Sequence, residues 1–323
     1  MTVSTRHNPR AAPPTTGPNM NAVAAHRASL PPRVGAARRL ERSHGARLVR
    51  APRAAAGGGS ADVTTDRPIV IVTGGAKGIG AACCEVLAEQ GWAVAINHRA
   101  SSAEVAEALV DKIRSEGGHA RAFEADVGVE ADVVEMFARA AQWGRLAGLV
   151  NNAGVLVGPN GSKTVADADI EDLEAIMRVN VVGPMLCCRE AIRHMSNREG
   201  AEGNPPPGAG GSIVNISSGS AVIGRPLLYA MSKGALNSFQ AGAVDELASH
   251  GIRVNAVSPG MTDTDLVADV VPNFDFSKIP LGRIGQPREI AEGVAFLLGE
   301  KGSYCSGANI RMSGGRPPGT FLG

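Results

Sequence analysis

Hydrophobic positions follow two alternating patterns from residue 67 onward. Short apolar runs, such as residues 69–72 and 212–216, have the length and β-branched composition of buried strands. Between these runs, stretches of about three turns carry apolar residues at helical spacing, which predicts amphipathic helices. Because parallel strands are joined by right-handed crossovers of this kind, the pattern predicts a single α/β domain.

The elements can be placed along the chain with approximate bounds. We expect strands at 69–72, 92–96, 119–124, 146–150, 212–216, 252–257 and 308–312, and helices at 81–87, 102–116, 130–141, 170–196, 229–249 and 288–299. Residues 197–211 are rich in Gly and Pro and predict a mobile loop, and residues 261–287 carry little regular pattern, as a substrate lid would. Ligands of such sheets bind beyond the carboxyl ends of the strands.

A glycine-rich turn links the first strand to the first helix. It reads Thr-Gly-Gly-Ala-Lys-Gly-Ile-Gly from Thr73 to Gly80. Glycines let the backbone approach a pyrophosphate, and the following helix N-terminus offers N–H groups to its charge. The turn therefore predicts dinucleotide binding, although its spacing departs from Gly-x-Gly-x-x-Gly.

A tyrosine and a lysine lie four positions apart in a predicted helix. Tyr229 and Lys233 therefore share one helix face. A phenol titrates near pH 10, and an ammonium about 4 Å away would lower that pKa by up to about 3 units. Taken alone, this spacing is more typical of an ordinary amphipathic surface.

Together, these motifs resemble those of the classical short-chain dehydrogenase/reductase family. The family's Thr-Gly-x-x-x-Gly-x-Gly motif is met from Thr73 to Gly80 and its Asn-Asn-Ala-Gly motif at residues 151–154; Asn180, Ser218, Tyr229, Lys233 and Pro259-Gly260 follow in order. The resemblance covers about residues 67–315 and is closest to members similar to 3-oxoacyl-[acyl-carrier-protein] reductases. It implies a doubly wound Rossmann fold with a mostly parallel, seven-stranded sheet.

The resemblance implies a catalytic set of four residues. These are Asn180, Ser218, Tyr229 and Lys233. Ser218 is chosen over Ser217 because it lies six residues before Gly224, and Ser217 is expected to bond backbone. The interval from Ser218 to Tyr229 is eleven residues, two shorter than is common in the family. Asn180 would hold a water on a proton relay, with a buried structural role as the alternative.

The resemblance also implies a set of cofactor contacts. Gly260 and Pro259 would shape the nicotinamide pocket, and Thr264 would bind pyrophosphate. Asp126 would accept from the adenine amino group, or instead cap the following helix. Thr73 and Asn151 are expected to brace strands. The expected contacts are Thr73, Gly74, Lys77, Gly78, Ile79, Gly80, Arg99, Asp126, Val127, Asn152, Ala153, Gly154, Tyr229, Lys233, Pro259, Gly260, Thr262 and Thr264, with no metal ligand.

Charge at the end of the second strand bears on the choice of cofactor. Enzymes that prefer NAD usually place an acid there, whereas this chain reads Asn97-His98-Arg99 and carries Lys77 in the glycine turn. Two cations at a 2′-phosphate favour NADP(H) over NAD(H). The alternative is that both cations are ordinary solvated charges.

The net charge of +1 hides an asymmetric distribution. Residues 1–60 hold ten Arg, no Lys and the single acid Glu41, which gives +9 there and −8 in the remainder. We predict that residues 1–66 are a leader resembling an organellar transit peptide, with a chloroplast favoured over a mitochondrion. A disordered basic arm or a nucleic-acid-binding tail are the alternatives, and nucleic-acid binding is disfavoured because the segment has no aromatic residue for base stacking. Residues 316–323 form a C-terminal tail.

The remaining composition excludes several classes of protein. Hydrophobic residues make up 44% of the chain without an apolar run near eighteen residues, so no membrane span is expected. Five cysteines without Cys-x-x-Cys spacing suggest neither a disulfide framework nor a zinc site. Neighbouring cysteines in the helical runs are expected to act as small hydrophobic residues.

The family resemblance implies an oxidoreductase that acts on a carbonyl or a secondary alcohol. A 3-oxoacyl thioester is one candidate, but His250 and Ala209 stand where carrier-binding reductases commonly have arginines, so less positive charge meets an acidic carrier. Sugars, polyols or small ketones are the alternative substrates, and a non-catalytic NADPH-binding sensor is the alternative class. The resemblance also implies a homotetramer or dimer through the helices at 170–196 and 229–249, without a nucleic-acid or membrane partner.

Overall fold

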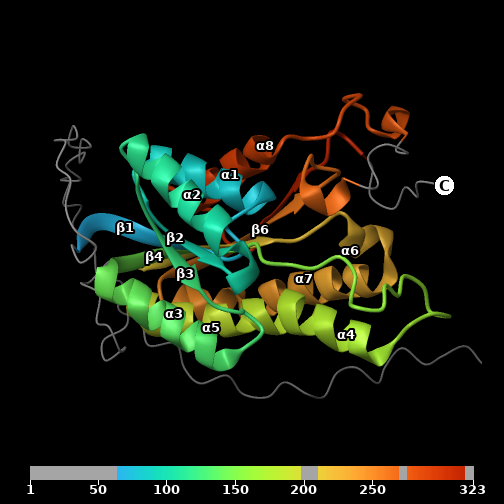
Figure 1. The fold of residues 1–323 in the computed structure, drawn as a ribbon, viewed down its shortest axis with the longest axis horizontal. Coiled ribbons are helices and arrows are strands. Elements are labelled where there is room, and N and C mark those ends of the chain that lie inside the picture. Colours follow the sequence, from blue (N-terminus) through green and yellow to red (C-terminus); the bar gives the residue numbers. More distant parts are fainter. Residues whose placement is uncertain (1–63, 198–209, 269–274, 317–323) are drawn as a thin grey trace, which may run out of the picture. The chain divides into compact units, whose positions relative to one another are not determined.

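The computed structural model describes residues 64–197, 210–268 and 275–316 (Figure 1). Nearly all of the predicted leader and tail, and most of the predicted loop at 197–211, lie outside the described residues. No helix in the described ranges combines the length and the apolar character that a membrane crossing requires.

Seven parallel strands form one sheet in the order β3-β2-β1-β4-β5-β6-β7. The predicted doubly wound α/β fold is therefore confirmed, and the sheet is parallel throughout. The strands are β1 (Thr65–Val72), β2 (Ala93–His98), β3 (His119–Glu124), β4 (Gly144–Asn151), β5 (Gly211–Ile216), β6 (Ile252–Pro259) and β7 (Asn309–Met312).

Helices cover both faces of this sheet (Figure 1). Helices α1, α2 and α8 pack on one face, and α3, α5 and α7 pack on the other. The helices are α1 (Gly78–Glu89), α2 (Ala103–Ser115), α3 (Glu130–Trp143), α4 (Ile170–Met177), α5 (Gly183–Met195), α6 (Ser220–Ile223), α7 (Leu227–Ser249) and α8 (Pro287–Leu298). Short 3-10 turns lie at Ala100–Ser102, Asp265–Val267, Phe276–Lys278 and Glu300–Gly302.

Strand β1 contributes to two separate cores because its side chains alternate between the faces of the sheet. Val70 and Val72 belong to the core beneath α1 and α8, while Ile69 and Ile71 belong to the core beneath α3 and α5. All four side chains are completely buried. A parallel strand covered on both faces reads as a continuous apolar run, which is why the sequence pattern located it.

The cysteine pairs lie in these same cores. Cys83 and Cys84 pack in the first core, and Cys187 and Cys188 pack in the second, where all four are free thiols. Burial raises the pKa of Cys83 to about 12. These thiols therefore act as small hydrophobic residues, as the sequence predicted.

The helix predicted at 170–196 is interrupted. It consists of α4, a π-helical stretch labelled η2 (Arg178–Val182), and α5. The apolar spacing does not distinguish one wider turn from a continuous α-helix, so the sequence pattern missed it. Single π-helical turns are common at functional sites, and this one contains Asn180.

Candidate active site

The predicted glycine turn lies at the carboxyl ends of β1 and β4. The hydroxyl of Thr73 donates to Val150 O (3.2 Å) and accepts from the backbone N–H groups of Asn152 (3.0 Å) and Ala153 (3.1 Å). The Asn152 amide donates in turn to Thr73 O (2.9 Å) and Gly74 O (3.0 Å). Thr73 thus braces the two strands, as predicted, and the turn and the Asn-Asn-Ala-Gly motif form one unit.

Three glycines of this turn have no room for a side chain. A Cβ on Gly80 would collide with Gly74 O and the Asn152 amide. Gly74 has a φ of +60°, and a Cβ on it would lie 3.0 Å from the Cα of Ala153. Gly78 has a φ of +55° and faces Thr264, whose Cγ2 would lie 3.2 Å from an added Cβ. The structure thereby brings Gly78 and Thr264 together, and their binding of one pyrophosphate remains a prediction.

Helix α1 begins directly after this turn. Its N-cap residue is Lys77, which makes no side-chain capping hydrogen bond. The first N–H groups of a helix have no partner within the helix, and they point out from its N-terminus. A dinucleotide pyrophosphate fits this position because the N–H groups and the helix dipole both favour an anion.

The two cations predicted for the 2′-phosphate are both exposed. Within the described part of the chain, neither the Lys77 nor the Arg99 side chain takes part in an ion pair or a hydrogen bond; the Arg99 carbonyl is paired with His98 Nδ1 (3.1 Å). The neighbouring Asn97 is buried: its Oδ1 accepts from Gly74 N (3.1 Å) and its Nδ2 donates to Ala125 O (2.9 Å). Asn97 therefore ties β2 to the glycine turn and leaves Arg99 as the charged residue after the strand.

Asp126 does not cap helix α3. One of its carboxylate oxygens accepts from Gly128 N (2.8 Å), and its own N–H donates to Asp132 Oδ2 (2.9 Å). The N-cap position belongs to Val129. Of the two roles weighed for Asp126, capping is thus wrong, and the adenine contact remains a prediction. Val127 is buried against Gly183.

Ser218 and Tyr229 are joined by a hydrogen bond between their side chains. The Ser218 hydroxyl also accepts from Ser220 N (3.1 Å). Ser217 points elsewhere and donates to Asn237 Oδ1 (2.6 Å), so the expectation that it bonds backbone is wrong. The choice of Ser218 from its distance to Gly224 agrees with this geometry.

Lys233 is only 3% exposed and lies beside the tyrosine. Its Nζ donates to Ile216 O (2.8 Å) and lies 5.6 Å from the centre of the Tyr229 ring. A Cβ on Gly154 would lie 3.6 Å from this Nζ, so the ammonium also borders the Asn-Asn-Ala-Gly motif. Burial lowers the pKa of Lys233 to about 8.

The pKa of Tyr229 differs from the expectation. Burial raises it above its ordinary value, and the hydrogen bond with Ser218 acts in the opposite direction. The sequence argument considered the charge of Lys233 but not the loss of water around the phenol, which disfavours the phenolate. The structure therefore holds Tyr229 as a neutral phenol, the form that donates a proton.

Asn180 occupies the π-helical stretch and is completely buried. Its Oδ1 accepts from Val155 N (2.8 Å), and its Nδ2 donates to Val155 O (2.9 Å) and Ser232 Oγ (2.9 Å). Ser232 in turn donates to Tyr229 O (2.7 Å). This is the buried structural role that the sequence left open; the water relay remains a prediction.

The carboxyl end of β6 is held next to the serine loop and β7 by backbone hydrogen bonds. Pro259 O accepts from Gly219 N (3.1 Å), which ties the serine loop to this strand. Gly260 N donates to Met312 O (2.9 Å), and a Cβ on Gly260 would lie 2.8 Å from Ser313 Cα. Thr262 is buried and donates to Gly260 O (3.2 Å), so its hydroxyl serves the backbone.

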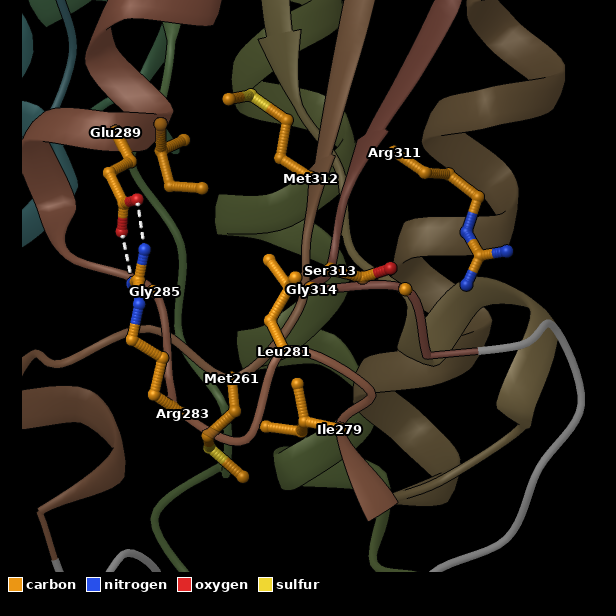
Figure 2. A pocket seen from close by; sticks show the side chains of 12 residues that line it. Met261, Ile279, Leu281, Arg283, Gly285, Glu289, Arg311, Met312, Ser313 and Gly314 are labelled. Carbon is orange, nitrogen blue, oxygen red and sulfur yellow. Dashed lines mark hydrogen bonds and ion pairs between the residues drawn. The ribbon is translucent and has the colours of Figure 1, made fainter. Parts of the chain in front are cut away.

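A cavity of about 330 Å³ next to the ends of β6 and β7 was not predicted (Figure 2). Figure 2 shows the Arg283–Glu289 ion pair at one side, with N–O distances of 2.8 and 2.7 Å. The residues that line it fall between Met261 and Gly315 and carry no shared motif. Its lining residues are Met261, Ile279, Leu281, Arg283, Gly285, Glu289, Ile290, Arg311, Met312, Ser313, Gly314 and Gly315.

Comparison with known proteins places this site in a family. A family model described as enoyl-(acyl carrier protein) reductase matches residues 74–316. The chain is 38% identical over 260 residues to the oxidoreductase YgfF of Escherichia coli K12, covering 77% of this chain and 99% of YgfF. It is 35% identical over 254 residues to cis-4-hydroxycyclohexanecarboxylate dehydrogenase of Sinomonas cyclohexanicum, with coverages of 76% and 95%. It is also 35% identical over 252 residues to the 3-oxoacyl-[acyl-carrier-protein] reductase FabG of Staphylococcus aureus, with coverages of 76% and 96%.

Solved structures agree with this family match. A dehydrogenase/reductase from Sinorhizobium meliloti superposes with a TM-score of 0.69 at 32% identity, covering 79% of this chain and 97% of that one. A short-chain dehydrogenase from Burkholderia cenocepacia, solved in complex with NADP, gives a TM-score of 0.68 at 32% identity, with coverages of 79% and 99%. With its glycine turn and the Ser218–Tyr229–Lys233 arrangement, the chain belongs to the short-chain dehydrogenase/reductase family of oxidoreductases.

Proposed function

We propose that this protein catalyses NADP(H)-dependent hydride transfer between the nicotinamide ring and a carbonyl or secondary alcohol. One observation carries the proposal: the hydrogen-bonded pair of Ser218 and Tyr229, with the buried ammonium of Lys233 beside it. The pair lies at the carboxyl end of β5, where ligands of open parallel sheets bind.

Bound NADPH supplies the hydride in this reaction. Ser218 donates a hydrogen bond to the carbonyl oxygen as negative charge develops on it. Tyr229 is a neutral phenol and gives its proton to the same oxygen. Lys233 holds its ammonium 5.6 Å from the ring of Tyr229 and stabilises the phenolate that remains.

NADP(H) is proposed over NAD(H) because of the charges near the ribose. Lys77 and Arg99 are exposed cations, and within the described residues neither is neutralised by a carboxylate. A 2′-phosphate would form charge-assisted hydrogen bonds with both side chains. The Burkholderia cenocepacia relative, solved in complex with NADP, supports this choice.

A 3-oxoacyl thioester is our first candidate substrate, and a small ketone is the second. The similarity to FabG supports the thioester. The small ketone is favoured by His250, which hydrogen-bonds to Ser196 at 2.8 Å in place of a carrier-binding arginine. The similarity to cis-4-hydroxycyclohexanecarboxylate dehydrogenase supports this candidate too. Ala209, the other position in this argument, lies outside the described residues.

We also propose that the protein forms a homo-oligomer through α5 and α7. Met185 on α5 is 47% exposed and Met231 on α7 is 49% exposed, and a subunit contact through these helices would bury both side chains. Import into a chloroplast by the Arg-rich leader remains a proposal that rests on the sequence of residues 1–66.

The test is NADPH oxidation by the full-length protein with a 3-oxoacyl thioester and a panel of small ketones, with Tyr229→Phe as the matched variant. We expect turnover with at least one carbonyl and a loss of about 10²- to 10⁴-fold in the variant, because the proton donor is removed. NADPH binding should persist in both proteins. Near-full turnover by the variant would refute the assignment of Tyr229, and binding without any turnover would favour a sensor.

A further inference from the structure

Asp172 is a fully buried carboxylate outside the catalytic set. It is the third residue of α4. Its Oδ1 accepts from Asn160 N (2.7 Å) and its Oδ2 accepts from Ser162 N (2.7 Å). The N–H of Gly161 and the hydroxyl of Ser162 also hydrogen-bond to this carboxylate. Three consecutive residues of one loop therefore turn their donors toward a single side chain.

The loop is shaped around this carboxylate. Gly161 has a φ of +78°, a left-handed conformation that lets successive N–H groups converge. Gly158 lies against Asp172 so closely that an added Cβ would collide with Oδ1. Gly161 N donates back to Gly158 O (3.2 Å), which closes the turn. Removing the carboxylate would leave the buried N–H of Ser162 and the partly buried N–H of Asn160 without an acceptor.

The same loop contacts the catalytic helix. Lys163 O accepts from the N–H of Leu227 (3.2 Å), the first residue of α7. The N-cap residue Pro226 supplies no side-chain cap to this helix. The Lys163 carbonyl thus binds an N–H group that the helix itself cannot satisfy, two residues before Tyr229.

The other end of the loop is also held by the α4–η2 segment. Asn180 binds Val155 through both its N–H and its carbonyl, at 2.8 and 2.9 Å. The segment from residue 155 to 163 therefore runs from the Asn-Asn-Ala-Gly motif to the start of α7 and is held at both ends. Asn180 thus holds one end of the loop, a contact that the sequence did not predict, and Asp172 holds the other.

The charge state of Asp172 suits this role. Burial acts to raise its pKa, and the hydrogen bonds from Ser162, Asn160 and Gly161 outweigh burial, so the pKa lies below its ordinary value. The side chain is a carboxylate at neutral pH, with acceptors for all of the converging donors.

We propose that Asp172 is a positioning residue for the reaction proposed above: it fixes the loop at residues 158–163 and, through the Lys163 carbonyl, the start of α7, which places Tyr229 against Ser218 and the bound carbonyl. This inference rests on the proposed function. An error of about 1 Å in such placement costs up to about 100-fold in rate.

The test compares Asp172→Asn with Glu171→Gln in the full-length protein. Asparagine has the same shape but replaces one of the two accepting oxygens by an NH₂ group, which then faces a backbone donor of the loop. Glu171 is the exposed neighbouring residue, and its variant removes the same charge from the same helix end. Its Oε2 accepts from Asn160 Nδ2 (3.4 Å) at the surface, a bond that the amide oxygen of glutamine can also accept, and the buried contacts of Asp172 are not touched. Ser162→Ala, which removes one donor and keeps the carboxylate, is a milder second variant should Asp172→Asn not fold.

Three quantities are measured: NADPH affinity, steady-state kinetics with an accepted carbonyl, and amide hydrogen exchange of residues 155–163 and 227–231. For Asp172→Asn we expect unchanged NADPH affinity and kcat per NADPH-binding site reduced by about 10- to 100-fold. Exchange should be about tenfold faster in both segments. Ser162→Ala should change in the same direction by less, and Glu171→Gln should match the wild type.

The outcomes distinguish a failure of the inference on Asp172 from a failure of the proposed function. A role limited to stability would lower the folded fraction but leave kcat per NADPH-binding site unchanged, and that result would overturn the proposal. Faster exchange in the loop without faster exchange at residues 227–231 would also overturn it. If the wild-type protein turned over no carbonyl, the proposed function would fail, and the exchange data would still decide whether Asp172 holds the loop and the helix start.

Discussion

Lys233 places its Nζ 5.6 Å from the centre of the Tyr229 ring and donates to Ile216 O at 2.8 Å. The ammonium is thus anchored by the strand that precedes Ser218, although burial lowers its pKa to about 8. Burying a charged amine costs stability, and under the proposed function that cost is retained because the charge stabilises the phenolate of Tyr229. This relationship leads to one prediction on stability and one on pH.

Lys233→Met should stabilise the protein at pH 7 while reducing its turnover. The pKa of Lys233 falls from its ordinary value of 10.5 to about 8 in the folded protein. Below pH 8 the buried charge therefore lowers the free energy of unfolding of the wild type by up to about 3 kcal/mol. The methionine variant recovers this amount, less about 1 kcal/mol for the lost hydrogen bond to Ile216 O. Between pH 8 and 10.5 the unfolded chain binds the extra proton, so wild-type stability rises with pH and the gain of the variant fades. Denaturant unfolding at pH 7 and pH 10 measures this; a variant less stable than wild type at pH 7 would contradict it.

Carbonyl reduction should decline as pH rises through about 8, because Lys233 loses the proton that stabilises the phenolate of Tyr229. The measurement is kcat against pH under saturating NADPH. Lys233→Arg, which stays charged across this range, should show no such decline in whatever turnover it retains. A decline that persists unchanged in the arginine variant would assign the titration to another group.

The two adjacent serines should differ sharply on replacement. Ser218→Ala removes the donor that contacts Tyr229 and should lower kcat by about 10²- to 10³-fold, the usual effect of losing one donor to a developing oxyanion. Ser217→Ala removes only the bond to Asn237 and should lower stability by about 1 kcal/mol. Equal losses of kcat in both variants would show that the site does not distinguish them. Kinetics and thermal unfolding of both proteins provide the comparison.

The cofactor preference should depend on Arg99 and Lys77. Alanine at either position should raise the KM for NADPH by about 10-fold and leave the KM for NADH unchanged, because only NADPH carries the 2′-phosphate. Lys301→Ala is the matched control, since Lys301 is exposed on a turn after α8. Parallel titrations with both cofactors measure the effect. Equal changes for NADPH and NADH would place these cations away from the 2′-phosphate.

Two glycine-to-alanine variants should affect different properties: Gly80→Ala should impair NADPH binding, and Gly242→Ala should raise stability. Gly80→Ala should abolish NADPH binding, because its Cβ would collide with Gly74 O and the Asn152 amide. Gly242 lies in α7 with nothing within 4 Å of an added Cβ, and its variant should gain about 0.5–1 kcal/mol through the helix propensity of alanine. Fluorescence titration with NADPH and thermal unfolding distinguish the two. A Gly80→Ala protein that binds NADPH normally would contradict the close packing of the turn.

The sequence predicted most of the fold because the strands are buried on both faces. Continuous apolar runs such as residues 69–72 cannot be confused with exposed segments, and the carboxyl ends of these runs carry the motifs. The π-helical stretch was missed since one wider turn leaves the apolar spacing almost unchanged. The short helix α6 was missed because four residues carry no periodicity.

The sequence predicted those properties of the site that depend on residue type and spacing. It did not predict those that depend on burial. Tyr229, Lys233 and Ser218 come together as expected, yet the pKa of Tyr229 shifts upward because the phenol is buried. The role of Asp172 had no sequence signal, since an acid in the first turn of a helix is common for electrostatic reasons alone. Only the fold shows that its carboxylate is enclosed by a loop ten residues earlier in the chain.

The π-helical stretch sets the rotation of one helix against the next. Each residue of an α-helix advances the chain by about 100° around its axis. The wider turn at Arg178–Val182 therefore lets α4 present Asp172 to the loop at residues 158–163 while α5 presents Cys187, Cys188 and Ala191 to the sheet. If the same residues formed a regular α-helix instead, α5 would be rotated by about 100° and its apolar stripe would turn away from the sheet. The wider turn thus sets the rotation of α5, which packs in the core, relative to α4, which contacts the active-site loop.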